Sequence, residues 1–337
     1  MRLLQTLSIL LVLLSTLGSC RSDSPGGPAG ANLRPGKSEL AIEFEGRRRT
    51  AVVFIPTLVA APEDGWPLVL MLHGAGGSAR NVIEATGWAD LGEHEGFVTV
   101  FPNGTPSYEG RKESFLRNPQ SWNSGEHSTF AARARSAIAK KVNDVGFLNA
   151  LIDTLGRRTT IDRRRIFVAG HSNGASMAYR FGFERSSLVA AVGAVAGHFM
   201  TTEGALRSPV SLIQIVGDQD PYTPLGGGEA GVGRHKMVVA PALEAPTRWA
   251  KLLGLAPEPR IIRDDEKLKE YEWGPSEQDE EVRSVIVKGQ GHNYPRRSVV
   301  RVSSIVMGPS VNSISATETI WDFFKSHPKP SQEEASE

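Results

Sequence analysis

The feature that most constrains the fold of this chain is a strand-like run that leads through a glycine-flanked serine into a helix-like run, at residues 165–180. The apolar residues 166–169 predict a short buried strand, and the apolar spacing after residue 174 predicts a helix. Between them lies Gly-His-Ser-Asn-Gly. A Gly-x-Ser-x-Gly pattern in this setting predicts a tight turn that presents Ser172 at a helix N-terminus, where main-chain amides favour a developing negative charge. Ser172 is therefore a candidate nucleophile; a glycine-rich turn without chemistry is the alternative.

Apolar runs alternate with helical patterns through most of the chain. The candidate strands are residues 40–44, 51–55, 68–72, 98–101, 166–169, 190–195, 212–216 and 282–287. The candidate helices are residues 82–89, 142–157, 175–184, 242–253 and 316–326. The first two strands are expected to form an antiparallel hairpin through Glu45 and Gly46, whereas later strands separated by helices imply parallel crossovers. We therefore predict an α/β fold, with a mostly parallel sheet, helices on both faces and an N-terminal antiparallel hairpin.

A serine nucleophile needs amide donors for the anion that forms during its attack. The apolar run that ends at Leu72 leads into His-Gly-Ala-Gly-Gly at residues 73–77, where glycines let the main chain approach a reacting carbonyl closely. We expect the amides of Ala75 and Asn173 to form this oxyanion hole. A simple turn at the end of the strand is the alternative for residues 73–77.

The serine also needs a base and a carboxylate that orients the base. The strand at 212–216 is followed by Gly-Asp-Gln-Asp-Pro, and His292 lies in a glycine-flanked turn after the last strand. We favour Asp220 as the acid, with Asp218 as the alternative. We favour His292 as the base, because the order serine, acid, histidine along the chain is that of nucleophile-elbow enzymes. An exposed loop histidine is the alternative for His292.

Other patterns near these residues receive a structural interpretation. His73 and His171 precede the places where a base should arise. The Asp-x-Asp pair has no third carboxylate or histidine nearby in the sequence, so we expect no metal site. Residues 226–231 match G-x-G-x-x-G but open no clear helix, which predicts a flexible loop rather than a dinucleotide site. With no His-Glu-x-x-His motif and no cysteine cluster, a zinc site has no support. The serine chemistry requires no metal or organic cofactor.

The polar, irregular stretch at residues 107–139 is long for a connection, so we expect it to lie over the site. It contains Trp122. Trp122 and Tyr222 are candidates for an aromatic slot that binds substrate; packing in the core or under a lid is an equal alternative.

Composition excludes some classes of partner. The 337 residues carry a formal net charge of +1, which gives no support for nucleic acid or an acidic polymer as a partner. The short basic clusters at residues 47–49 and 163–165 are better explained as solvated turns. The length would permit two domains, but open α/β folds often reach it as one.

The first residues have the pattern of an export signal. Arg2 precedes an apolar run at residues 3–17, which is short for a membrane span. The run ends in Leu-Gly-Ser-Cys, and Cys20 is the only cysteine, so no disulfide can form within the chain. This ending resembles the lipobox of bacterial lipoproteins, which implies that Cys20 is lipidated. An ordinary signal peptide with an incidental cysteine is the alternative.

Several motifs along the chain resemble those of one family. They are His73-Gly-Ala-Gly-Gly, Ser121-Trp-Asn, Asp144-Val-Gly-Phe, Gly170-His-Ser-Asn-Gly, Gly217-Asp-Gln-Asp-Pro, Gly291-His and Ser315-Ala-Thr-Glu-Thr-Ile-Trp-Asp-Phe-Phe. Their order is similar to that in the polyhydroxybutyrate depolymerase and feruloyl esterase group, which are secreted α/β-hydrolases related to carbohydrate esterase family one. The resemblance implies an α/β-hydrolase fold, a serine esterase activity and the acid position for Asp220.

The chain departs from that group in three places. No disulfide can hold the loops near the site, His171 stands where leucine is common, and the loop at 225–235 is longer and richer in glycine. The resemblance therefore implies the chemistry more firmly than any particular substrate.

Together these patterns predict an exported serine esterase that cleaves carboxylic esters through Ser172, His292 and Asp220. The expected substrate is an ester carried on a polymer, either polyhydroxyalkanoate or a feruloyl- or acetyl-substituted polysaccharide. The alternative is a non-catalytic lipoprotein that binds a polymer or polysaccharide through a hydrolase-derived cleft. A serine peptidase of similar fold is a weaker third hypothesis.

The predicted organisation has four parts: a lipoprotein signal peptide at 1–19, a flexible tether at 20–37, an α/β-hydrolase catalytic domain at 38–327 and a disordered tail at 328–337. It predicts an extracellular or cell-envelope location, with a lipid on Cys20 as the only contact with the membrane.

Overall fold

The computed structural model describes residues 32–125, 136–201, 204–232, 235–274, 280–296 and 304–330. The predicted signal peptide, Cys20 and the end of the predicted tail lie outside these residues. Within the described part of the chain, no helix combines the length and the apolar character that a bilayer crossing requires. The regular elements run from Gly36, in the first strand, to Lys325, in the last helix.

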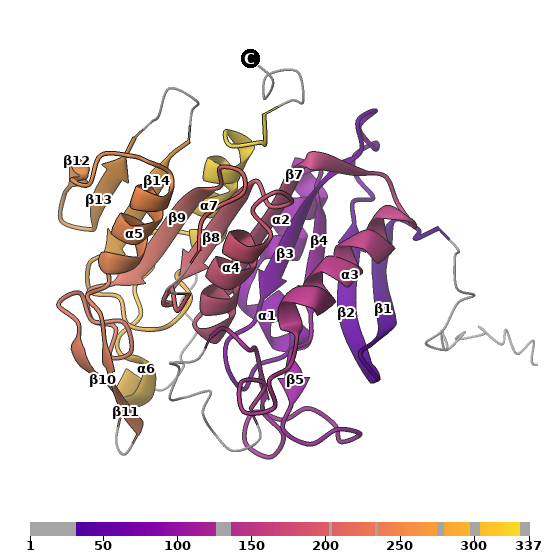
Figure 1. Cartoon of the computed structure of the whole chain (residues 1–337), viewed down its shortest axis with the longest axis horizontal. Helices are drawn as coiled ribbons and strands as arrows, with labels where there is room; N and C mark the ends of the chain where they lie inside the picture. Colours follow the sequence, from indigo (N-terminus) through magenta and orange to yellow (C-terminus); the bar gives the residue numbers. More distant parts are fainter. Residues whose placement is uncertain are drawn as a thin grey trace, which may run out of the picture.

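A ten-stranded sheet forms the centre of the fold (Figure 1). Its strands lie in the order β1-β2-β4-β3-β7-β8-β9-β14-β13-β12. The strands from β4 to β14 in this order are parallel to one another, and the strands at both edges are antiparallel. The bounds are β1 (Gly36–Phe44), β2 (Arg47–Ile55), β3 (Trp66–Leu72), β4 (Val98–Pro102), β7 (Ile161–His171), β8 (Ala191–Val195), β9 (Ser211–Gly217), β12 (Arg260–Asp264), β13 (Leu268–Trp273) and β14 (Val282–Val287). The mostly parallel sheet predicted from the sequence is confirmed.

Helices cover both faces of this sheet, also as predicted (Figure 1). Strand β3 shows how, because its side chains alternate between two cores. Leu68, Leu70 and Leu72 belong to the core with α3 (Asp144–Gly156), α4 (Asn173–Glu184) and α5 (Glu244–Leu252). Val69 and Met71 belong to the core with α1 (Ala79–Thr86), α2 (Trp88–Glu95) and α7 (Ala316–Lys325). A strand buried on both faces reads as a continuous apolar run, which is why the sequence marks it so clearly.

The two antiparallel edges differ in how visible they are in the sequence. The predicted hairpin of β1 and β2 is present and turns at Glu45 and Gly46, whose φ angles are 48° and 72°. The opposite edge, β13 and β12, has no counterpart in the sequence prediction. Every residue of β12 is exposed and its sequence, Arg-Ile-Ile-Arg-Asp, does not alternate, so no period-2 pattern marks it.

Two other expectations were wrong in detail. The helix predicted at 82–89 is instead the end of α1 and the start of α2, because Gly87 ends α1 in the left-handed conformation with φ 76°. The flexible loop predicted at 226–231 is in part a strand, since β10 (Gly228–Val232) pairs with β11 (His235–Val239). Main-chain hydrogen bonds hold this hairpin together. The glycine-rich sequence of β10 lacks the alternating apolar residues that would predict a strand. Shorter elements are β5 (Thr105–Pro106), β6 (Gln120–Ser121) and α6 (Ser304–Met307).

The topology brings the candidate residues together. In a sheet of parallel strands, the carboxyl ends of the strands meet at one edge, where ligands bind. His73 follows β3, Ser172 follows β7, Asp220 follows β9 and His292 follows β14. The chain therefore delivers four side chains, far apart in sequence, to the same edge of one sheet.

Candidate active site

The turn between β7 and α4 holds Ser172 in a conformation that few residues adopt. Its φ of 55° is positive, and it is the residue that caps the N-terminus of α4. The turn is closely packed: a Cβ at Gly170 would lie 2.2 Å from the carbonyl oxygen of Gly174, and one at Gly174 would lie 2.3 Å from that of Leu72. Only glycine fits at both positions, so the pattern around Ser172 reflects main-chain contact with the end of β3.

A chain of hydrogen bonds connects the serine to a carboxylate. The Ser172 Oγ and the His292 Nε2 are 2.8 Å apart. On the other side of the ring, the His292 Nδ1 lies 2.8 Å from the Asp220 Oδ2 and 3.0 Å from its Oδ1. The main-chain amide of His292 donates to the carbonyl of Met307 at 2.6 Å, which holds the turn that carries the imidazole.

The two competing aspartates have different partners. The Asp220 carboxylate is buried, faces His292 and also accepts the amides of Tyr222 and Thr223 at 2.7 and 3.1 Å. Burial raises the pKa of Asp220, but the charge and hydrogen bond of His292 together with the two amides outweigh it and lower that pKa below its ordinary value. Asp218 instead accepts the amide of Gly289 at 2.7 Å, which joins the end of β9 to the turn after β14.

The amides of Ala75 and Asn173 are both free to bind a ligand oxygen. In the described part of the chain neither is paired with an acceptor, although Gly76 and Gly77 beside Ala75 donate to the carbonyls of Gln120 and Gly74. Asn173 is the first residue of α4, so its amide has no partner within the helix. Both residues line the same cavity as Ser172.

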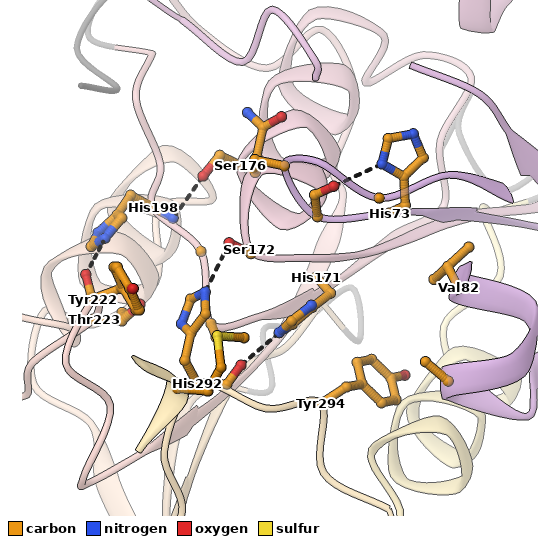
Figure 2. A pocket seen from close by; sticks show the side chains of 18 of the residues that line it. His73, Val82, His171, Ser172, Ser176, His198, Tyr222, Thr223, His292 and Tyr294 are labelled. Carbon is orange, nitrogen blue, oxygen red and sulfur yellow. Dashed lines mark hydrogen bonds between the residues drawn. The ribbon is translucent and has the colours of Figure 1, made fainter. Parts of the chain in front are cut away.

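That cavity has a volume of about 720 Å³, and Ser172 and His292 are among the residues that line it (Figure 2). Val82 and Tyr294 lie on one side of the serine, and His198 and Tyr222 lie on the other (Figure 2). None of the described residues that line it is Asp, Glu, Lys or Arg. The cavity is therefore suited to an uncharged ligand.

Several lining residues were not predicted from the sequence. They include Val82, Ser176, His198, Met200, Val232, Met237 and Tyr294. His198 comes soon after the carboxyl end of the parallel strand β8, a position that could have indicated it. Val232 and Met237 belong to the β10–β11 hairpin, whose strands the sequence conceals.

The two aromatic candidates for substrate binding have different locations. Tyr222 lines the cavity, and its ring centroid lies 4.7 Å from that of His292. Trp122 does not reach the cavity: its side chain is fully buried, and its indole N–H donates to the carbonyl of His73 at 2.9 Å. The expectation that Trp122 contacts substrate is therefore corrected, and packing, the alternative considered for it, describes its place.

Of the stretch at 107–139 predicted to lie over the site, Phe115 lines the cavity, while residues 126–135 lie outside the described part of the chain.

His73 and His171 are held as neutral rings by their surroundings. Burial lowers the pKa of each from 6.5 to about 4. The His73 Nε2 accepts the amide of Gly104 at 2.9 Å while its Nδ1 faces the carbonyl of Gly74 at 2.8 Å. The His171 Nε2 donates to the carbonyl of His292 at 2.7 Å and so supports the main chain that carries the candidate base. Within the described residues, no group of three or more His, Cys, Asp or Glu is arranged to hold a metal ion.

Comparison with known proteins identifies the family. The model of the phospholipase/carboxylesterase family matches residues 56–244, which is more than half of the chain. The chain belongs to the phospholipase/carboxylesterase family. The matched segment of this carboxylesterase-family chain includes Ala75, Ser172 and Asp220, and it ends before His292.

Two curated relatives of this family member are esterases by name. "Putative esterase NocK" of Nocardia uniformis subsp. tsuyamanensis is 28% identical over 174 residues, which cover 51% of this chain and 45% of that protein. The bifunctional acetylxylan esterase/xylanase XynS20E of Neocallimastix patriciarum is 22% identical over 249 residues, which cover 74% of this chain and 31% of that protein. The chain spans less than half the length of these two relatives.

Solved structures share the fold. The acetyl xylan esterase from Aspergillus awamori superposes with a TM-score of 0.54 at 13% identity, over 86% of this chain and 99% of that one. The structure of pOPH superposes with a TM-score of 0.57 at 15% identity, over 93% of each chain. The carboxylesterase-family chain thus has the α/β-hydrolase fold that the sequence motifs implied.

Two histidines of this carboxylesterase-family protein, His73 and His171, make its stability depend on pH. In the unfolded chain, His73 and His171 take up protons near pH 6.5, whereas in the folded chain they stay neutral until about pH 4. Their contribution to stability is therefore complete above pH 6.5 and is lost as the pH falls from 6.5 towards 4. Each lowered pKa corresponds to a loss on the order of 3 kcal/mol.

We predict that His171→Leu reduces this dependence. Its free energy of unfolding, measured by urea denaturation at pH 7.0, 5.5 and 4.5, should fall less steeply than that of the unaltered protein, by on the order of 2 kcal/mol over the range. His94→Gln, at an exposed histidine of α2, is the control and should leave the slope unchanged. Identical slopes for His171→Leu and the unaltered protein would contradict the assignment.

Proposed function

We propose that the protein is a serine esterase that hydrolyses carboxylic esters through a covalent acyl-enzyme on Ser172. One observation carries the proposal: in a chain of the carboxylesterase family, the Ser172 Oγ, the His292 imidazole and the Asp220 carboxylate form an unbroken line of hydrogen bonds beside a cavity. A protein that only bound a polymer would have no need of a serine aligned on a carboxylate-paired imidazole.

The geometry supports a particular direction of proton transfer. The His292 Nδ1 faces the ionised Asp220, so the ring proton resides on Nδ1 and leaves Nε2 as an acceptor. The His292 Nε2 then removes the hydroxyl proton of Ser172 as the Oγ attacks the ester carbonyl carbon. Asp220 stabilises the imidazolium that results.

The oxyanion of the tetrahedral intermediate would lie against the amides of Ala75 and Asn173. Neither amide has an acceptor among the described residues, and that of Asn173 stands at the positive end of α4. Amide donors fixed in advance stabilise the charge without reorganisation during the reaction. When the intermediate collapses, the alcohol leaves with the proton from His292. Water, deprotonated by the same ring, then attacks the acyl carbon and releases the acid and Ser172.

We predict that Ser172→Ala and Asp220→Asn each lower kcat for p-nitrophenyl butyrate by about 10^4-fold, because the three residues act as a unit. Asp218→Asn is the matched control for the acid, since its carboxylate bonds Gly289 rather than His292. Ser176→Ala is the control for the serine, because the Ser176 hydroxyl lies in the same cavity but accepts the amide of His198. Turnover by folded Ser172→Ala at the unaltered rate would rule out this mechanism.

The size and lining of the cavity favour an ester whose acyl or alcohol group is uncharged and larger than acetate. Its volume of about 720 Å³ lies within the range of sites that enclose small molecules. Its described lining is apolar or neutral. One curated relative and one structural neighbour are named as acetylxylan esterases, which supports esters carried on a polymer. We therefore propose a polymer-borne substrate, either polyhydroxyalkanoate or a polysaccharide with acetyl or feruloyl substituents.

We predict that neutral esters are preferred over charged ones of the same size, because none of the described residues that line the cavity is Lys or Arg. For matched p-nitrophenyl esters, kcat/KM for the butyrate should exceed that for the hemisuccinate by at least about 10-fold. A panel of acetylated xylan, a feruloylated arabinoxylan fragment and short polyhydroxybutyrate then identifies the polymer. Equal rates on butyrate and hemisuccinate would contradict the neutral character of the site.

We further propose that the protein is exported and held at the cell envelope by a lipid on Cys20. The support comes from the sequence alone, since residues 1–31 lie outside the described part of the structure. Expression of the full chain in a bacterium with radiolabelled palmitate should label it and direct it to the detergent phase on Triton X-114 partition. Cys20→Ser should abolish both results. An unlabelled, aqueous-phase full-length protein would contradict the lipid anchor.

A further inference from the structure

A second network of buried hydrogen bonds lies beneath the two amides assigned to the oxyanion hole. It centres on residues 122–124, the segment that follows β6. The indole N–H of Trp122 donates to the carbonyl of His73 at 2.9 Å. The main-chain N–H of Trp122 donates to the side-chain Oδ1 of Asn173 at 2.7 Å. One buried residue therefore contacts both segments that carry the amides.

The Asn173 side chain is bound on both of its polar atoms. Its Oδ1 accepts the Trp122 amide, and its Nδ2 donates to the Trp122 carbonyl at 3.2 Å and to the Ser124 hydroxyl at 3.0 Å. It pairs with the main chain of Trp122 much as a neighbouring strand would. This pairing fixes the first residue of α4, whose own amide is one of the two assigned to the oxyanion hole.

The other amide is fixed through His73. Ala75 lies two residues beyond His73, whose carbonyl accepts the indole of Trp122 and whose ring lies 5.0 Å from the indole between centroids. Gly76, directly after Ala75, donates its amide to Gln120 at 2.7 Å, in β6. The segment that carries Trp122 thus bonds to the main chain on both sides of Ala75.

The segment is itself anchored from a distance. The amide of Asn123 donates to the Asp144 Oδ2 at 2.7 Å, and the carbonyl of Asn123 accepts Arg180 at 2.7 Å. The Asp144 Oδ1 pairs with the Arg49 Nη2 at 2.7 Å, and both side chains are buried. A buried ion pair is weak evidence for a gain in stability, because desolvation of the charges offsets their attraction. The hydrogen bond from the Asn123 amide to Asp144 is instead explained by a role of Asp144 in positioning residues 122–124.

We infer that Trp122 and the Asn173 side chain form a clamp that sets the separation of the Ala75 and Asn173 amides, with Asp144 as its remote anchor. Trp122 is a positioning residue: it lies outside the cavity and acts through the two segments that it joins. The inference rests on the proposed esterase function and deepens it.

A clamp of this kind acts on the transition state. Amides displaced from their place weaken the binding of the tetrahedral oxyanion, whereas the ground-state ester makes little use of them. Loss of the clamp should therefore lower kcat, with little change in KM. The hydrogen bonds of Ser172, His292 and Asp220 stay intact, so the pH profile of kcat should keep its shape.

The test compares Trp122→Phe with Trp249→Phe. Both tryptophans are fully buried, and each donates its indole N–H to a main-chain carbonyl, that of Val210 for Trp249 at 2.8 Å. Trp249 does not line the cavity, and its ring packs against Tyr179 and Phe199. The two substitutions therefore remove equivalent bonds at different places, and their thermal unfolding is measured in parallel.

For Trp122→Phe we expect kcat for p-nitrophenyl butyrate to fall by about 10- to 100-fold, KM to stay within about twofold and the pH profile to be unchanged. The affinity for an alkyl trifluoromethyl ketone, which forms a tetrahedral adduct with the serine, should fall by the same factor as kcat/KM. Trp249→Phe should leave all four quantities unchanged. Asn173→Ala, which keeps the main-chain amide, should repeat the pattern of Trp122→Phe if that variant does not fold.

Each other outcome contradicts the clamp. Activity of Trp122→Phe and Asn173→Ala equal to that of Trp249→Phe would overturn it while leaving the esterase function intact. So would a loss confined to KM, or a loss of kcat with unchanged affinity for the ketone. An unaltered protein that neither turns over esters nor binds the ketone would overturn the proposed function, and the clamp with it.

Discussion

The close main-chain contact between the β7–α4 turn and the end of β3 is the constraint on which the rest of the site depends. A Cβ at Gly174 would lie 2.3 Å from the carbonyl oxygen of Leu72, so the turn can take its place only without a side chain there. At that contact Ser172 has a positive φ, and the start of α4 lies beside the His73–Gly77 turn. The nucleophile and both candidate amides are thereby positioned by the ends of two neighbouring strands, β3 and β7.

The remaining groups reach this point along neighbouring parallel strands. Asp220 follows β9 and His292 follows β14, and the two strands are paired directly in the sheet. Asp218 and Gly289 join the same two strand ends by a hydrogen bond of 2.7 Å, so the aspartate that does not face the base holds its turn in place. A Cβ at Gly217 would lie 1.9 Å from the carbonyl oxygen of Gln290, which is a second close main-chain contact at the site. The arrangement needs no disulfide, as expected of a chain whose only cysteine is Cys20.

Much of this could be predicted from the sequence because strands buried on both faces leave apolar runs, and β3, β9 and the second half of β7 are of that kind. The residues after such strands are the natural candidates for chemistry, and Ser172, Asp220 and His292 were indicated in that way. Strands with neither an apolar run nor an alternating apolar pattern were not predicted. The glycine-rich β10 and the charged β12 are examples, and with β10 the wall formed by Val232 and Met237 was missed.

Trp122 shows a different limit. Its place beside a polar, irregular stretch suggests an exposed aromatic slot, whereas its indole and main chain bond to His73 and Asn173 in the interior. Local sequence does not indicate which of two distant segments a side chain will join. The motifs that contain Trp122 and Asp144 are explained once both are seen as supports of the amides.

The most direct test of the central claim is covalent capture of the nucleophile. Incubation of the folded protein with a fluorophosphonate probe, followed by intact-mass measurement and peptide mapping, should show one adduct per chain, on Ser172, and none in Ser172→Ala. A folded protein that stays unlabelled, or that is labelled at another residue, would contradict the assignment of Ser172 as the reactive serine.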